Sequence, residues 1–121
     1  LKAELTMSED CLFCKIIDGK IPSTEVYRDE DVFAFEDINP AAPTHILVIP
    51  TKHLKDIKAA NEEDRDLLGK ILLTANQISN ERGLAHDGFR YVINTGKHGG
   101  QTVYHLHLHI LGGRDLNWPP G

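Results

Sequence analysis

The chain has 121 residues, of which 40% are hydrophobic and 26% are charged, and its formal net charge is −5 at pH 7. This length suits one domain with one hydrophobic core. The negative charge argues against a surface that binds the phosphates of DNA or RNA, which normally needs a basic stripe. No apolar run reaches the roughly 18 residues that a membrane span needs, so we expect a soluble protein with neither a nucleic-acid nor a membrane partner.

Both ends of the chain are predicted to lie outside the regular fold. The start lacks the basic and apolar regions of a secretion signal, and Met7 is interpreted as the native start, behind a remnant of residues 1–6. The last residues include a proline pair, which cannot continue a helix or a central strand. We therefore expect a single domain over residues 7–121 with an irregular tail over 112–121.

The first half of the chain predicts a short helix followed by three strands. Apolar residues at helical spacing favour a helix over residues 11–17, and Gly19 is the residue expected to terminate it. Residues 26–27 and 32–35 are rich in β-formers and flank a charged turn, which is typical of a hairpin. An apolar run bounded by prolines over residues 45–49 predicts the third strand.

The second half predicts a long helix followed by two strands. From Asn61, a good N-cap residue, apolar positions recur at helical spacing until Gly83. Residues 89–94 and 104–111 are predicted strands, joined by a glycine-rich loop over 95–101. The fold class is therefore α+β, with an antiparallel sheet of about five strands, one short helix and one long helix.

The last predicted strand carries the most informative motif, because residues 105–109 read HLHLH. Strand side chains alternate between faces, so His105, His107 and His109 should share one face while the leucines between them enter the core. A solvated polar face would explain any single histidine. Three together indicate chemistry, since imidazole titrates near neutral pH. The central residue, His107, is the natural nucleophile.

The motif and its surroundings resemble the histidine-triad family, and within it the Hint branch. The family signature is His-x-His-x-His with hydrophobic x, as in residues 105–111. Four further segments are similar to Hint proteins: residues 37–45, 48–50, 99–104 and the ending 111–121. The resemblance covers residues 11–121.

The resemblance implies a homodimer that hydrolyses purine nucleoside phosphoramidates, such as adenosine 5'-monophosphoramidate or adenylylated lysine. It implies that His107 attacks phosphorus and forms a nucleotidyl-histidine intermediate, which water cleaves to the nucleoside monophosphate. His109 would help to protonate the departing amine, and His105 would orient His107. No metal ion is needed for this chemical step.

The resemblance also implies a nucleotide site. Asp37 would bind the ribose hydroxyls, although a carboxylate before Asn39-Pro40 could equally cap a turn. Asn94 and Thr102 would contact the phosphate or the leaving group, with donors from the neighbouring loop, namely Gly100 and Gln101. The apolar residues implied for the purine pocket are equally good core residues by periodicity; they are Leu12, Phe13, Ile16, Phe35 and Ile38.

Two cysteines, Cys11 and Cys14, form a Cys-x-x-Cys pair without a disulfide framework, which fits a reduced cytoplasmic setting. The pair suits tetrahedral zinc if two more ligands come from elsewhere, and the candidates are His53 and His105. Similar zinc-bearing relatives combine such a pair with a downstream histidine. Alternatively, the cysteines are small buried residues of a short helix, and His53 belongs to the active site. The other histidines are interpreted as structural or solvent-exposed: His45, His86 and His98.

Two other functions remain open from the sequence. In the first, His105 and His107 are a ligand pair of a zinc hydrolase that uses metal-bound hydroxide, although no third ligand with suitable spacing is evident. In the second, the chain is a nucleotide-binding or scaffolding module without catalysis, since a fold and a pocket do not prove turnover.

Overall fold

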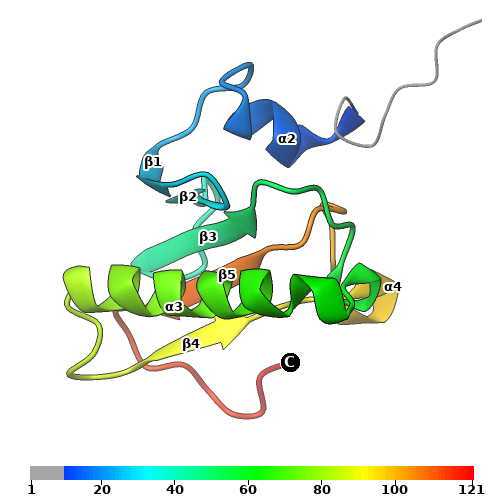
Figure 1. Ribbon diagram of the computed structural model, residues 1–121. Coiled ribbons are helices and arrows are strands. Elements are labelled where there is room, and N and C mark those ends of the chain that lie inside the picture. The colour runs from blue at the N-terminus through cyan, green and yellow to red at the C-terminus, as the bar shows by residue number, and fades with distance from the viewer. Residues whose placement is uncertain (1–9) are drawn as a thin grey trace, which may run out of the picture.

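The computed structural model describes residues 10–121, so the predicted native start and the remnant before it lie outside the described residues. The main elements are three α-helices, of which α4 is a single turn, and five strands (Figure 1). In chain order the bounds are α2 (Leu12–Ile17), β1 (Glu25–Arg28), β2 (Val32–Glu36), β3 (Thr44–Pro50), α3 (Arg65–Glu81), β4 (Phe89–Val92), α4 (Gly96–Gly99) and β5 (Leu108–Gly112).

The five strands form one antiparallel sheet in the order β1-β2-β3-β5-β4. The predicted α+β class and strand number are therefore confirmed. The β1–β2 hairpin turns on Asp29, whose carboxylate accepts the N–H groups of Asp31 and Val32 at 2.8 Å. Within residues 10–121, no helix is both long and apolar enough to cross a membrane.

Alternating side chains divide the sheet into two faces. One face packs against α3, which lies across the sheet in Figure 1, and the other packs against α2. On β2, for example, Ala34 belongs to the α3 side and Phe35 to the α2 side. Leu106 and Leu108 enter the core under α3 as predicted, while His107 packs edge-on against Phe13 of α2 with the ring centres 5.1 Å apart.

The histidine strand is shorter than the sequence predicts. The sequence predicts a strand over residues 104–111, but β5 begins only at Leu108. The β3–β5 ladder ends where Val48 pairs with Leu108, and two residues further along β3 stands Pro50, which has no N–H to donate. The N–H of Leu106 donates instead to the carbonyl of Leu54, outside the sheet. His105 and His107 therefore lie in an irregular segment that leads into β5.

Two neighbouring predictions are corrected in the same way. The strand predicted over residues 89–94 stops at Val92, because its partner β5 begins at Leu108 and offers no ladder beyond Val92↔His109. The loop predicted over residues 95–101 contains the one-turn helix α4. Gly100 ends this helix at φ +81°, a conformation that glycine adopts without strain.

Both predicted helices are confirmed, with small differences at their ends. The thiol of Cys11 caps α2 by accepting the N–H of Cys14 at 3.3 Å. Asn61 and Asp64 form a capping box over one 3-10 turn, and α3 continues from Arg65 to Glu81. Leu72 is one of the apolar positions at helical spacing in the predicted helix, but it is 47% exposed.

Ile78→Ala should lower the free energy of unfolding by about 2–5 kcal/mol. Ile78 lies on α3, is 1% exposed and belongs to the core between α3 and the sheet, so the truncation removes buried methyl groups and leaves a cavity. Chemical denaturation measures the change. Asn80→Ala on the exposed side of the same helix is the control and should change the stability by less than about 0.5 kcal/mol; equal effects of both variants would contradict this description of the core.

Candidate active site and metal centre

A pocket of about 430 Å³ opens on the α2 side of the sheet. It is mainly apolar, with polar groups at Asp37, Asn39, Thr102 and the two histidines His107 and His109. Its lining includes every apolar residue predicted for the purine site, which are Leu12, Phe13, Ile16, Phe35 and Ile38. Of these, Ile38 is 84% exposed at the rim, which a core residue would not be.

Three of the predicted nucleotide residues do not line this pocket. Gln101 is buried, and its side chain bonds the backbone: its amide N–H groups donate to the carbonyls of Lys55 and Val103, and its oxygen accepts the N–H of Gly96. Gly100 and Asn94 lie in the neighbouring α4 loop. Their nucleotide contacts stay predictions, and the contacts of Gln101 indicate that it shapes the loop that carries Thr102.

The geometry of His107 leaves one ring nitrogen free for attack. Its Nδ1 lies 2.8 Å from the carbonyl oxygen of His105, so Nδ1 carries the proton and donates it. The lone pair is therefore on Nε2. Burial lowers the pKa of His107, which keeps the ring neutral near pH 7. A buried neutral imidazole with a fixed tautomer, lining a pocket, can act as a nucleophile.

His109 is hydrogen-bonded to His45, which the sequence predicts to be structural or solvent-exposed. The Nδ1 of His45 accepts the N–H of Ala41 at 2.9 Å, so the proton of His45 is on Nε2. This Nε2–H donates to Nδ1 of His109 at 2.9 Å and lies 3.4 Å from the Asp37 carboxylate. His109 must then carry its own proton on Nε2, which is buried and has no hydrogen-bond partner within residues 10–121.

The charge state of His109 follows from the same surroundings. Burial, with smaller contributions from His107 and His45, lowers the pKa of His109 to about 4. The ring is therefore a neutral Nε2–H donor near pH 7 in the free protein. A phosphate anion in the pocket would favour its protonated form. The signal that could have revealed His45 is its position opposite His109 on the neighbouring strand, since Leu47 pairs with His109 and His45 lies two residues away on the same face.

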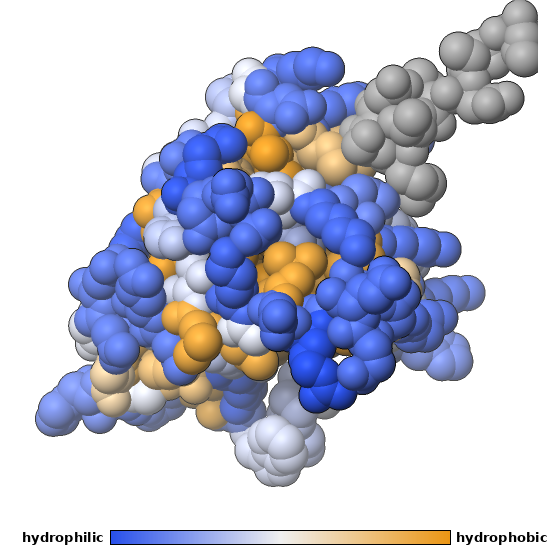
Figure 2. Space-filling view, viewed as in Figure 1, coloured by the Kyte–Doolittle hydropathy of each residue, from blue (hydrophilic) through white to orange (hydrophobic). Residues whose placement is uncertain are grey.

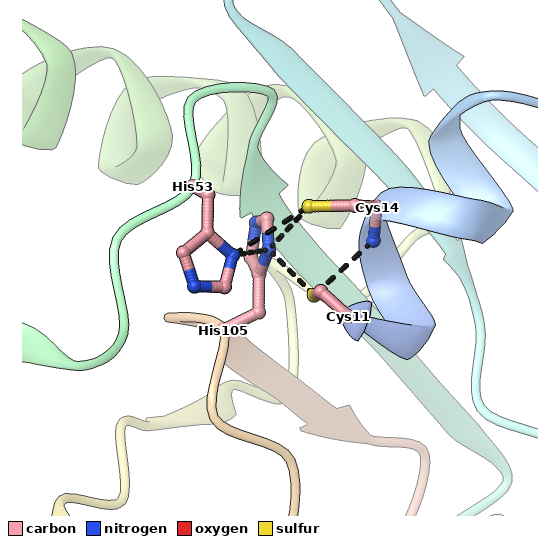
Figure 3. A group of neighbouring side chains, drawn as sticks. All are labelled: Cys11, Cys14, His53 and His105. Carbon is pink, nitrogen blue, oxygen red and sulfur yellow. Dashed lines mark hydrogen bonds between the residues drawn. The ribbon is translucent and has the colours of Figure 1, made fainter. Parts of the chain in front are cut away.

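The four residues predicted to bind zinc do come together (Figure 3). Their ligand atoms all lie within 4.8 Å of one another. Nδ1 of His105 is 3.3 Å from the Cys11 thiol, 3.5 Å from the Cys14 thiol and 3.2 Å from Nδ1 of His53. His53 therefore belongs to this cluster, and it does not line the pocket.

The donor set fits a tetrahedral zinc ion. Nε2 of His105 donates to the carbonyl of Pro50 at 2.8 Å, which leaves a lone pair on Nδ1 facing the thiols. Both cysteines are free and buried. Burial and the neighbouring Cys11 raise the pKa of Cys14 to about 12, so a thiolate there needs a cation beside it. A second group, Asp37 with His45 and His109, fits a metal poorly, because the proton on His45 Nε2 occupies the position that a metal would need.

Comparison with known proteins identifies the family. The family model "Scavenger mRNA decapping enzyme C-term binding" matches residues 10–116. A curated protein of Synechocystis, described as an uncharacterised HIT-like protein, is 53% identical over 115 residues, which are 95% of this chain and all of that protein. The chain belongs to the histidine-triad (HIT) family.

Solved HIT structures share this fold. A HIT family hydrolase from Legionella pneumophila superposes with a TM-score of 0.90 at 51% identity, covering 92% of this chain and 99% of the other. A histidine triad nucleotide-binding protein from Candida albicans gives a TM-score of 0.78 at 30% identity, covering 90% and 82%. The resemblance seen in the sequence is confirmed at the level of the HIT family.

Proposed function

We propose that this HIT protein hydrolyses purine nucleoside phosphoramidates to the nucleoside monophosphate and a free amine. The observation that carries the proposal is the pairing of a bare Nε2 on His107 with an N–H donor on His109 at one apolar pocket. The names of two relatives, a HIT family hydrolase and a histidine triad nucleotide-binding protein, support nucleotide hydrolysis in general.

The proposed reaction has two steps. First, Nε2 of His107 forms a bond to phosphorus while the bond from phosphorus to the amine nitrogen breaks. His109, which takes up a proton when the phosphate anion occupies the pocket, gives its Nε2 proton to that nitrogen as it departs. Water then attacks phosphorus and returns a proton to Nε2 of His109, and the bond to His107 breaks. Over both steps, one water supplies a proton to the amine and a hydroxyl to the phosphate. A covalent route divides one difficult displacement into two easier ones.

The pocket supplies binding groups of the right chemistry. Phe13 and Phe35 meet edge to face with ring centres 5.3 Å apart, which gives the pocket an aromatic wall for a planar base. Asp37 lies at the rim, where its carboxylate can accept ribose hydroxyls. Oδ1 of Asp37 accepts the N–H of Asn39 at 2.8 Å, so Asp37 caps the turn and still has Oδ2 for the ribose.

We further propose that Cys11, Cys14, His53 and His105 hold one structural zinc ion. Four protein ligands leave no open position for a substrate, so the ion would tie α2 and the loop after β3 to the segment before β5. The zinc-hydrolase alternative is disfavoured, because the ring of His105 faces the thiols while Nδ1 of His107 faces a carbonyl. Metal-bound hydroxide would need both rings on one ion.

The experiment that tests the function follows release of the nucleoside monophosphate from adenosine 5'-monophosphoramidate. We expect turnover by the purified protein. Binding of the monophosphate without turnover of any phosphoramidate would favour the non-catalytic binding module. Turnover that is lost within seconds of adding a chelator, before any unfolding, would favour metal-bound hydroxide.

The homodimer implied by the Hint resemblance is also a proposal. β4 is an edge strand, and exposed apolar side chains occur on it and on α3: Leu72 is 47%, Leu73 69% and Phe89 38% exposed. Apolar patches also interrupt the hydrophilic face shown in Figure 2. The tail carries Trp118, which is 79% exposed and would lie near the partner's pocket.

The dimer predicts a molecular mass of about 27 kDa, twice the chain mass of 13.5 kDa, by light scattering at micromolar concentration. Burying the exposed apolar residues of α3 and β4 supplies the driving force. Leu73→Glu should shift the mass toward the monomer, whereas Asn80→Glu on the same helix should leave it unchanged. A wild-type monomer at these concentrations would contradict the proposal.

A further inference from the structure

The C-terminal segment is joined to the pocket by a continuous series of hydrogen bonds. Arg114, in the first turn after β5, donates from its guanidinium to the carbonyl of Ala41 at 2.9 Å. The N–H of Ala41 donates to Nδ1 of His45, and Nε2 of His45 donates to Nδ1 of His109. Arg114 therefore lies three hydrogen bonds away from the ring that supplies the N–H donor in the pocket.

The same segment is fitted closely against the loop before β3. Gly113 has φ +95°, and a Cβ atom at this position would come within 2.8 Å of Pro43 Cβ. Only glycine allows this approach. The close packing at Gly113 fixes where Arg114 leaves the sheet, so its bond to Ala41 follows from the backbone path and is not an isolated contact between mobile side chains.

The bond from Arg114 matters because Ala41 is otherwise weakly held. Ala41 is exposed and lies between two prolines, in a loop that runs from Asp37 to β3. Its carbonyl accepts from Arg114 on one side of Cα, and its N–H donates to His45 on the other. Holding both peptide groups fixes the direction of the N–H. This N–H occupies Nδ1 of His45 at 2.9 Å, and the Asp37 carboxylate lies 3.4 Å from Nε2, so both neighbours favour the proton on Nε2.

We infer that Arg114 is a positioning residue for the reaction proposed above: it orients Ala41 so that His45, and through it His109, keep their protons on Nε2. The inference rests on the proposed function for its kinetic consequence but not for its structural one. Without the Ala41 donor, only the Asp37 carboxylate at 3.4 Å still favours the proton on Nε2, and His45 can also place it on Nδ1. The Nε2 of His45 then accepts from Nδ1 of His109, and the pocket loses its donor.

The structural test measures the ring tautomers directly. In wild type, 15N chemical shifts of the histidine rings should report protons on Nε2 of His45 and His109 near pH 7. In Arg114→Met the His45 shifts should move toward a mixture of tautomers, and Arg114→Lys should restore part of the change. Arg90→Met is the matched control, because Arg90 donates to the tail carbonyls of Leu116 and Asn117 and not to Ala41; it should leave the ring shifts unchanged.

The kinetic test compares leaving groups. Because the His109 donor assists the departing nitrogen, Arg114→Met should lower kcat about fivefold for an alkylamine phosphoramidate, as expected for loss of one hydrogen bond in the transition state. For an arylamine, which departs with little assistance, kcat should change by less than about twofold, and KM should not change for either.

The two tests separate the two proposals. Unchanged ring shifts in Arg114→Met, or equal shifts in Arg90→Met, would overturn the role of Arg114 whatever the activity. If the ring shifts change in Arg114→Met but the wild-type protein hydrolyses no phosphoramidate, the positioning role stands and the proposed function is overturned. An equal loss of kcat for both leaving groups would mean that Arg114 acts only through general stability of the site.

Discussion

Replacing His107 with alanine should abolish phosphoramidate hydrolysis, with a loss in kcat of about 1,000-fold or more, because the substitution removes the atom that forms the covalent bond. Nucleotide affinity should stay within about threefold, since in the proposed site the contacts to the base and ribose come from other residues. Calorimetry with the nucleoside monophosphate measures the affinity, and release of the amine measures turnover.

The nucleotidyl-histidine itself can be trapped to test the same mechanism. The bond between phosphorus and imidazole is acid-labile, so denaturation at alkaline pH followed by mass spectrometry is the suitable method. The added mass should map to His107 in wild type and be absent from His107→Asn. An adduct on another residue, or near wild-type turnover in His107→Ala, would refute the covalent route.

Cys14→Ala should remove the metal and lower the melting temperature by about 10 °C. Wild type should contain about one zinc ion per chain by the four-ligand argument. Loss of a ligand removes the free energy that metal binding adds to folding, and a loss of about 2–3 kcal/mol corresponds to such a shift in a domain of this size. Elemental analysis and calorimetry measure the two quantities.

His53→Ala is the companion variant, because its ring joins the cluster from the loop after β3. It should behave like Cys14→Ala in metal content and in melting temperature. Turnover abolished with the metal retained would instead assign His53 to the active site. If the wild-type protein contains no metal and Cys14→Ala has the same melting temperature as wild type, the cysteines are only small buried residues.

Much of the fold could be predicted from local patterns. The alternation on β2 and β3 and the helical spacing from Leu67 to Ile78 identify elements with an apolar face. These patterns are informative because burying such a face in the core stabilises the element. The ends of the elements were less predictable. β5 begins at Leu108 and β4 ends at Val92, so both are shorter than predicted. Their ends depend on hydrogen bonds to a neighbouring strand that is distant in sequence.

The candidate site was predicted unevenly for a similar reason. The pocket residues and the four-residue cluster followed from the family resemblance, and their geometry agrees with it. His45 was missed because its role comes from a contact with His109 across 64 positions of sequence. Gln101 was assigned to the phosphate through the family resemblance, as a donor of the loop. Its backbone N–H donates to the carbonyl of Gly96, and its side chain bonds the backbone around it.

The absence of an N–H on Pro50 helps to keep the segment before β5 out of the sheet. A residue with an N–H at this position would let the sheet extend past Val48, and the carbonyls of the segment before β5 would then be drawn into ladder bonds. In the β3–β5 register position 50 faces Leu106, so the carbonyl of residue 50 would accept the N–H of Leu106 in place of the ring of His105. One missing hydrogen atom in the backbone thus helps to end the ladder before the segment that carries His105 and His107.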